Sequence, residues 1–224
     1  MFEPLKLEYL SKKKTEVLRE PSSTRPAIWV AEDDNAKAVV KDYSVNKLLY
    51  RNLVGRLLIW REKKAYRRLR GLEGVPNFFG VADGLALVIE KVPGQSFEGL
   101  EKELKLPKSF FDDLRILVKK IHDRGVAHCD LKRAPNILLG DDGKPYIIDW
   151  SAAILERECR FFPLNLVYKR FLKDDFNATI KAQLRHCPEA LTEEQKRAYF
   201  RRNRLERLIR RVRDLLREFL QKIA

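Results

Sequence analysis

The first third of the chain alternates short apolar runs with turn-forming residues. Residues 15–20, 27–32 and 37–43 are such runs, and the segments PSSTRP and DDNA separate them. Two more runs lie within 74–90, on either side of the dipeptide Asp83-Gly84. Short runs bounded by turn signals are typical of antiparallel strands. The sequence therefore predicts a β-rich region that ends near residue 90.

A helical pattern interrupts these strands at residues 45–70. Apolar residues recur there every three or four positions, which is typical of a helix with one buried face. Gly55 is a candidate interruption. The candidate buried positions are Leu49, Leu53, Leu57, Trp60 and Leu69. We therefore expect one main helix packed against the sheet.

After a Pro- and Gly-containing connector at 91–96, the pattern becomes mainly helical. Residues 108–124 form a helical repeat, and Gly125 suits a C-terminal cap. Its expected buried positions are Phe110, Leu114, Leu117, Val118 and Ile121. Two short strand-like runs, 136–140 and 146–150, then flank the turn DDG, and helix dominates again from residue 162.

The order of these elements predicts an α+β, bilobal chain. Residues 1–90 would form an N-lobe with an antiparallel β-sheet and one main helix, residues 91–96 a hinge, and residues 97–224 a mostly helical C-lobe. The two lobes would together form one domain with a cleft between them.

Composition narrows the class of protein. The chain has 224 residues and is 45% hydrophobic, which is enough for a packed core. No apolar run approaches the ~18 residues that a membrane-spanning helix needs, and the N-terminus lacks a signal-peptide core, so we expect a cytoplasmic protein. Cys129, Cys159 and Cys187 are widely spaced and odd in number, which indicates reduced thiols rather than disulfides or a zinc site.

The net charge of +14 indicates an anionic partner: a nucleotide, a nucleic acid, or an anionic lipid or saccharide surface. Residues 196–222 hold 11 Lys or Arg against 3 Asp or Glu. The apolar positions of this terminal stretch recur at helical spacing: Leu205, Leu208, Ile209, Val212, Leu215, Leu216, Phe219 and Ile223. We expect this stripe to close the C-lobe core. The alternative is an interfacial helix on an anionic membrane.

Polar residues crowd against apolar runs at three places. The stretch HCDLKRAPNILL, residues 128–139, contains a His, an Asp, a Lys and an Asn within nine positions. YIIDW places Asp149 directly after a buried run, where a carboxylate is costly unless it meets a metal or another cation. AVVK places Lys41 in a strand. Phosphoryl transfer needs metal ligands, a cation on the phosphates and a group that orients the acceptor.

In this order along the chain, the motifs resemble the protein-kinase-like superfamily. They are most similar to its small atypical bacterial members, the RIO-type kinases and the lipopolysaccharide core (Kdo or heptose) kinases. The resemblance covers about residues 15–155. It implies a bilobal protein-kinase-like fold that transfers the γ-phosphate of ATP to a hydroxyl, with Mg²⁺, or alternatively Mn²⁺, as the metal.

The resemblance implies a role for each matching residue. Asp130 would orient the acceptor hydroxyl and accept its proton, and Lys132 would contact the transferring phosphate. Asn136 and Asp149 would be metal ligands. Lys41 would hold the α- and β-phosphates. His128 would support the catalytic loop without titrating in the reaction.

Glu62 is the expected partner of Lys41. It is the one carboxylate between Asp42 and Glu73, and nine Lys or Arg surround it. The alternative is a solvated residue that pairs along its own helix.

Two nucleotide-binding segments are less distinctive. PSSTRP replaces the Gly-rich phosphate loop, and the hydroxyls and backbone amides of Ser22, Ser23 and Thr24 would contact phosphate. An ordinary turn is the equal alternative. LVIEKVPG resembles a kinase hinge: Ile89 would be the gatekeeper, and the Glu90 carbonyl and Val92 backbone would bind the adenine edge.

The chain departs from the kinase pattern at two points. Five residues separate Asp130 from Asn136, where the family usually has four, so the loop bulges or Asn136 is displaced. Trp150 and Ser151 replace the usual Phe and Gly after the metal aspartate. Both changes argue against activation-loop switching.

The acceptor does not follow from the catalytic motifs. The segment after Asp149 is short and helical and lacks an Ala-Pro-Glu anchor, so we expect a sugar hydroxyl of the lipopolysaccharide inner core on an anionic glycolipid, with peripheral contact at the inner membrane. The alternatives are a RIO-like Ser/Thr protein kinase and a catalytically inactive kinase-fold binding module. A nucleic-acid-binding protein would leave the acidic residues of the cleft unexplained. The sequence leaves the oligomeric state open.

Overall fold

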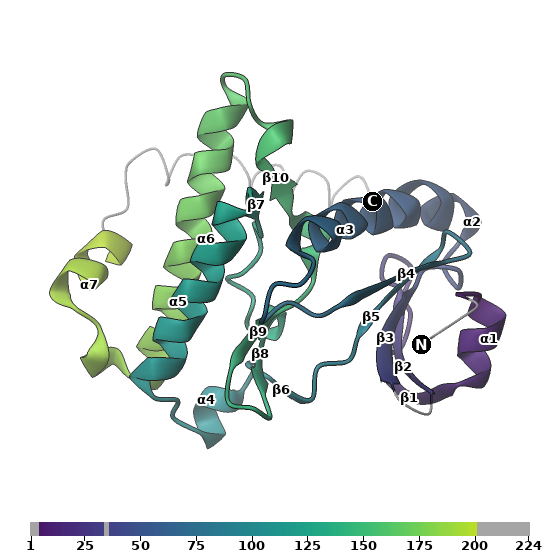
Figure 1. Ribbon diagram of the computed structural model, residues 1–224, viewed down its shortest axis with the longest axis horizontal. Helices are drawn as coiled ribbons and strands as arrows, with labels where there is room; N and C mark the ends of the chain where they lie inside the picture. Colours follow the sequence, from purple (N-terminus) through teal and green to yellow (C-terminus); the bar gives the residue numbers. More distant parts are fainter. Residues whose placement is uncertain (1–4, 34–35, 201–224) are drawn as a thin grey trace.

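The computed structural model describes residues 5–33 and 36–200. Figure 1 shows a five-stranded sheet with a long helix on one side of the molecule and two long, antiparallel helices on the other, with short strands between them. This arrangement confirms the α+β class and the two lobes that the sequence predicts. The expected apolar stripe at 205–223 lies outside the described residues.

The N-lobe sheet is antiparallel throughout, in the order β1-β2-β3-β5-β4. Its strands are β1 (Lys14–Arg19), β2 (Ala27–Asp33), β3 (Ala36–Asp42), β4 (Phe78–Ala82) and β5 (Ala86–Glu90). A helix that the sequence did not predict, α1 (Leu7–Lys12), places the fully buried Leu10 in the same cluster as Trp29 and Val40. This helix therefore covers one face of the sheet.

The main N-lobe helix is built from three pieces. They are α2 (Leu48–Tyr50), a π-helical turn (Arg51–Gly55) and α3 (Arg56–Leu69). The interruption at Gly55 is present, and there a Cβ would come within 3.1 Å of the Tyr43 ring. Glycine is therefore the residue that lets this turn approach the strand end so closely.

The prediction of the buried positions of this helix is wrong for four of the five residues. Leu69 is buried, whereas the other four side chains are 53–74% exposed: Leu49, Leu53, Leu57 and Trp60. The helix carries two stripes at helical spacing, and the one that faces inward contains Ile59, Glu62, Tyr66 and Leu69. Periodicity alone does not decide which of two such stripes is buried.

The C-lobe follows the predicted order. Its elements are β6 (Gly94–Ser96), α4 (Leu100–Glu103), α5 (Lys108–Asp123), β7 (Val126–Ala127), β8 (Ile137–Gly140), β9 (Pro145–Ile147), β10 (Ile154–Leu155), α6 (Leu164–His186) and α7 (Glu193–Phe200). All five apolar positions expected on α5 are buried, and Gly125 takes the left-handed conformation of a C-terminal cap. The second half of the expected connector 91–96 is β6, which pairs with β8.

One apolar cluster joins the two lobes. It includes Leu87 and Ile89 of the sheet, Tyr66 of α3, and Leu117 and Trp150 of the C-lobe. Each such side chain stabilises the fold by about 1.5–3 kcal/mol when it is fully buried. The apolar contact therefore holds α3 against both lobes, next to the cleft.

All three cysteines are free thiols in the structure. Among the described residues, no group of three or more His, Cys, Asp or Glu side chains is arranged to hold a metal, and no helix there is both long and apolar enough to cross a membrane.

Candidate active site

Three charged side chains meet between the lobes. Lys41 on β3 places its Nζ 2.6 Å from Glu62 Oε1 on α3 and 2.9 Å from Asp149 Oδ1 after β9. Lys41 is 8% exposed and Glu62 is 1% exposed. Residues from three separate parts of the chain thus form one cluster, in which Lys41 and Glu62 are buried and the Asp149 side chain is 34% exposed, so a solvated Glu62 is excluded.

The charges in this cluster act on one another. The Lys41 ammonium holds the pKa of Asp149 well below its usual range, against the opposing effect of burial, and a 2.9 Å hydrogen bond from Ser151 Oγ adds to the lowering. Burial by itself would lower the pKa of Lys41, but the Asp149 and Glu62 carboxylates outweigh it and raise that pKa. Burial raises the pKa of Glu62, and Lys41 opposes the rise. At neutral pH, Asp149 is therefore an ionised carboxylate.

A buried aspartate on α6 anchors the catalytic loop from below. Asp175 is 2% exposed, and its carboxylate accepts hydrogen bonds from the backbone amides of His128 (2.7 Å) and Cys129 (3.0 Å). Cys129 has a φ of 67°, a strained conformation for a residue other than glycine. The two bonds to Asp175 hold the loop in this conformation just before Asp130.

His128 connects the catalytic loop to the strand that leads to Asp149. Its Nδ1 accepts the Asp130 amide at 3.3 Å, so its Nε2 is the atom that donates to the Ile148 carbonyl at 2.9 Å. The ring also packs on Trp150, with the ring centres 4.7 Å apart. With both nitrogens engaged and 1% of the residue exposed, His128 is placed to support the loop.

The segment from Asp130 to Asn136 ends in a tight turn. A 3₁₀ turn, Ala134–Asn136, follows the bend after Asp130. Asn136 Nδ2 still reaches the Asp130 carbonyl at 3.0 Å, and the Asn136 carbonyl accepts the Ile148 amide at 3.0 Å. These bonds keep Asn136 close to Asp130 and to the strand that leads to Asp149.

The donor set around Asp149 fits a magnesium ion. Because the Asn136 carbonyl bonds to Ile148, Asn136 lies beside the residue that precedes Asp149. The Asn136 amide nitrogen donates to the Asp130 carbonyl, so Oδ1 is the side-chain atom that could contact a metal. One ionised carboxylate and one amide oxygen, completed by phosphates and water, are the ligands that Mg²⁺ prefers in nucleotide sites. The two negative charges on one ammonium also leave the cluster able to accept a cation.

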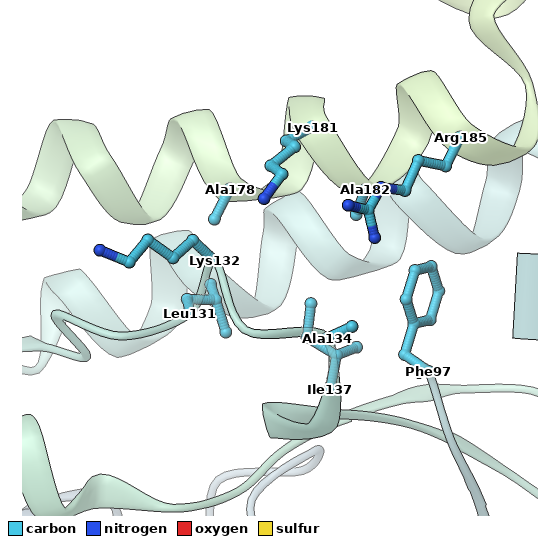
Figure 2. Close-up of a pocket in the computed structure, with 9 residues that line it drawn as sticks. All are labelled: Phe97, Leu131, Lys132, Ala134, Ile137, Ala178, Lys181, Ala182 and Arg185. Carbon is cyan, nitrogen blue, oxygen red and sulfur yellow. The ribbon is translucent and has the colours of Figure 1, made fainter. Parts of the chain in front are cut away.

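A small cavity lies beside the catalytic loop, on the side of α6. Figure 2 shows its floor of apolar side chains and, above it, Lys181 and Arg185, which point from α6 toward the loop. Lys132 also lines the cavity, while its ammonium extends away from the cavity centre. The nine lining residues are Phe97, Leu131, Lys132, Ala134, Ile137, Ala178, Lys181, Ala182 and Arg185. Two cations of α6 thus border the loop that carries Asp130, whose side chain is 27% exposed and pairs with Arg133 at 3.5 Å.

The expected phosphate loop lies at the end of the sheet that carries Lys41. Lys41 pairs with Ile28 of β2, and the loop directly precedes this strand. Asn46 Nδ2 donates to the Ser22 carbonyl at 2.7 Å, and the Tyr50 hydroxyl donates to the Thr24 carbonyl at 2.6 Å. These contacts hold the loop through its backbone carbonyls. The side-chain hydroxyls of Ser22, Ser23 and Thr24 take no part in them.

The expected hinge segment follows β5. Ile89 is 3% exposed within the core, at the position proposed for the gatekeeper. The amide of Glu90 donates to the Asn77 carbonyl at 2.8 Å, and its carboxylate accepts the Asn77 amide at 2.9 Å. Adenine contacts would therefore fall to the Glu90 carbonyl and the backbone of Val92.

Sequence reasoning missed two residues that organise the site. Asp175 lies on the buried stripe of α6 with Tyr168, Thr179 and Ala182, so an acid on an apolar helical face was the available signal. Asn46 is 6% exposed and holds the loop that contains Ser22. It lies between strand and helix, and no pattern in the sequence marks it.

Comparison with known proteins places this site in a family. Residues 29–164, more than half of the chain, match the RIO domain. The chain belongs to the RIO domain family. The matched range runs from β2 to the start of α6 and includes Lys41, Glu62, Asp130 and Asp149. The RIO-type side of the resemblance is confirmed, and the lipopolysaccharide kinase side rests on the sequence alone.

Curated relatives of this RIO domain chain are kinases. The serine/threonine-protein kinase PknD of Chlamydia trachomatis serovar D is 49% identical over 65 residues, which cover 26% of this chain and 7% of PknD. Casein kinase II subunit alpha' of Saccharomyces cerevisiae is 31% identical over 104 residues, 41% of this chain and 31% of that protein. The chain thus spans less than a third of either relative. The family and the relatives support a kinase.

Proposed function

We propose that this protein is a RIO-like serine/threonine kinase that transfers the γ-phosphate of Mg-ATP to a protein hydroxyl. The position of Lys41 between Glu62 and Asp149 is the observation that carries the proposal. A buried ammonium with two carboxylates is costly to assemble unless its charges are used. In a kinase, Glu62 would hold Lys41 on the α- and β-phosphates.

The metal would bind at Asp149 and Asn136. A metal ion held there would supply positive charge to the phosphates of the nucleotide. Ser151 would keep Asp149 in its orientation through the bond to Oδ1, in addition to the bond from Lys41. Replacement of the usual glycine by Ser151 is thus a change that supports the carboxylate.

Asp130 would act on the acceptor. In the transfer, a bond forms between the acceptor oxygen and the γ-phosphorus, the bond from that phosphorus to the β–γ bridging oxygen breaks, and Asp130 takes up the hydroxyl proton. Lys132 would contact the transferring phosphate. Asp175 and His128 would act as positioning residues, because they hold the backbone on either side of Cys129.

A protein acceptor now ranks above the sugar hydroxyl that the sequence favoured. Phosphoryl transfer to a serine hydroxyl and to a sugar hydroxyl needs the same catalytic groups. The residues of the cleft therefore do not distinguish the two acceptors. The relatives with 49% and 31% identity carry the names of a serine/threonine-protein kinase and a casein kinase subunit. The glycolipid has no comparable support. The cations Lys181 and Arg185 beside the catalytic loop suit an acidic segment of the acceptor.

The test incubates the protein with radiolabelled ATP and Mg²⁺, with whole-cell protein or extracted lipopolysaccharide core as acceptor. We expect label on Ser or Thr, and loss of that label in Asp149→Asn, because the change removes the one ionised carboxylate of the proposed metal site. Asp113→Asn, an exposed aspartate on α5, is the matched control and should keep full activity.

The outcomes separate the alternatives. Label on the glycolipid with none on Ser or Thr would restore the sugar kinase. Absence of transfer together with equal thermal stabilisation of the wild type and Asp149→Asn by Mg-ATP would favour the inactive binding module.

A further inference from the structure

Exposed apolar side chains are concentrated in two segments of the described chain. Of the 18 large hydrophobic residues that are exposed there, 12 lie in residues 45–60 and 161–167. They are Val45, Leu48, Leu49, Leu53, Val54, Leu57 and Trp60 in the first segment and Phe161, Phe162, Leu164, Leu166 and Val167 in the second. We call these twelve the apolar surface. Single exposed apolar residues are ordinary, but a concentration of this kind marks an interaction site.

The two segments lie on the same side of the molecule. Lys64, one turn after Trp60 on α3, forms a salt bridge with Glu158, three residues before Phe161. Arg61 of the same helix donates to the Ala153 carbonyl at 2.9 Å. In Figure 1 the turn that precedes α6 projects beyond the other elements at the top of the view, above the level of α3. Phe161 and Phe162 in this turn are 80% and 77% exposed.

The opposite face of α3 is buried in the core of the protein. Ile59, Tyr66 and Leu69 belong to the core that joins the lobes, so α3 cannot rotate to bury the exposed stripe without losing the Glu62 ion pair. The exposed positions 49, 53, 57 and 60 recur every three or four residues and continue through the π-helical turn. The exposed apolar stripe is therefore a fixed part of the folded structure.

The charge around the apolar surface has one sign. Residues 45–64 contain six Lys or Arg, and their one carboxylate is the buried Glu62. Residues 157–170 contain four Lys or Arg, and their one carboxylate, Glu158, is paired with Lys64. The ligand of such a surface must supply both an apolar phase and negative charge.

We propose that the apolar surface docks on an anionic lipid bilayer. Leu and Trp side chains flanked by Lys and Arg are the composition of helices that lie in the membrane interface, and basic residues add attraction to anionic headgroups. The projecting Phe161 and Phe162 suit insertion rather than reception of a partner helix, which needs a groove.

Electrostatic repulsion also argues against two other ligands of the apolar surface. Residues 201–224 have apolar positions at helical spacing but carry nine Lys or Arg against three Asp or Glu, so their net charge has the same sign as the surface. A second copy of the chain would bring the same cations and the same repulsion. An acidic protein would satisfy the charge, and the test is designed to detect it.

Trp60 is a natural reporter of docking. The chain has three tryptophans, of which Trp29 is 3% exposed and Trp150 is 0% exposed, whereas Trp60 is 54% exposed. Vesicles of phosphatidylcholine and phosphatidylglycerol should shift the emission of the full chain to shorter wavelength, and Trp60→Phe should remove the shift. Phosphatidylcholine alone should give little shift. Soluble polyglutamate, which offers charge without an apolar phase, should give none.

Vesicle flotation with variants tests the residues themselves. Phe161→Ser/Phe162→Ser and Leu53→Gln/Leu57→Gln should each lower partitioning onto anionic vesicles by about tenfold or more, because each removes two exposed apolar side chains from the contact. The matched control is Ile116→Gln on α5, which is 52% exposed but lies outside the apolar surface. It should bind like the wild type. Asp149→Asn should also bind normally, so a failure of the kinase proposal would leave this result unchanged.

Three outcomes would overturn the proposal. One is no flotation and no Trp60 shift with anionic vesicles. A second is equal binding by the surface variants and Ile116→Gln. The third is a concentration-dependent oligomer, or a complex with an acidic protein, that Phe161→Ser/Phe162→Ser abolishes while vesicle binding is unaffected. Circular dichroism melting of each variant checks that its fold is intact.

Discussion

The catalytic loop (residues 128–136) and the proposed phosphate loop (residues 21–26) are held in different ways. In the catalytic loop, the buried carboxylate of Asp175 binds two consecutive backbone amides, and His128 ties the loop to the strand before Asp149. In the phosphate loop, Asn46 and Tyr50 bind backbone carbonyls, and the side chains at positions 21–25 are exposed.

The catalytic loop is therefore held more firmly than the loop at residues 21–26. A group that takes a proton must be held closely in place, since small displacements reduce the rate strongly. A phosphate loop at residues 21–26 would need only to offer donors to a flexible triphosphate. We therefore expect changes in the catalytic loop to affect turnover by orders of magnitude, and changes in the phosphate loop to affect nucleotide affinity modestly.

The largest effect should come from Asp130→Ala. Loss of a positioned proton acceptor typically lowers turnover by about 10²–10⁴-fold. Nucleotide affinity should stay nearly unchanged, because Asp130 acts on the acceptor. Steady-state phosphorylation and nucleotide titration of the same variant measure the two quantities. If ATP affinity collapsed as well, the assignment of the catalytic loop would be wrong.

Asp175→Ala would make the catalytic loop as loosely held as the phosphate loop. Two buried amides would lose their acceptor, so the free energy of unfolding should fall by about 3 kcal/mol. Turnover should fall too, as the strained Cys129 relaxes. The matched control is Asp174→Ala, whose carboxylate is 42% exposed and pairs with Arg170. Denaturant unfolding of both variants is the measurement, and equal losses would mean that the anchor is unimportant.

Lys41 on the sheet and Glu62 on α3 form the buried ion pair of the proposed site. Since each single change removes the same ion pair, the double-mutant cycle of Lys41→Ala and Glu62→Ala should show a coupling of about 1–3 kcal/mol. Thermal or denaturant unfolding and kcat/KM give two independent cycles. Additive losses in both would contradict the pair at 2.6 Å.

Much of the fold could be predicted because its signals are local. The strands of the N-lobe, helix α5 and the cap at Gly125 follow from runs, spacing and turn residues. The orientation of α3 did not, because the helix carries two stripes and the fold, through Glu62 and Tyr66, selects one of them. Helix α1 was missed because six residues are too few to show a period.

The site divides in the same way. Lys41, Asp130, Asn136 and Asp149 lie next to recognisable motifs, and in the structure Lys41 bonds to Asp149 and Asn136 bonds to the Asp130 carbonyl. Asp175 is 45 residues from Asp130 in the sequence, and its bond to the loop exists only in the folded chain. Elimination by charge located Glu62, but no such argument was available for a carboxylate on the acid-containing helix α6.

The smallest expected effect tests the phosphate loop itself. If the hydroxyls of Ser22, Ser23 and Thr24 contact phosphate, their combined change to Ala should raise the KM for ATP about three- to tenfold, since each lost hydrogen bond has a net value near 1 kcal/mol and not all three need engage. Stability should change little, because these side chains are exposed and the loop is held through its carbonyls.

The control for this prediction is Asn46→Ala, which removes the bonds to the Ser22 and Arg25 carbonyls at 2.7 and 3.0 Å. It should lower stability and loosen the loop while leaving every hydroxyl in place. Two results are thus distinguishable by KM and melting temperature measured together. A triple variant with unchanged KM, beside an Asn46→Ala variant with a raised KM, would show that the backbone of the loop, and not its hydroxyls, meets the phosphates.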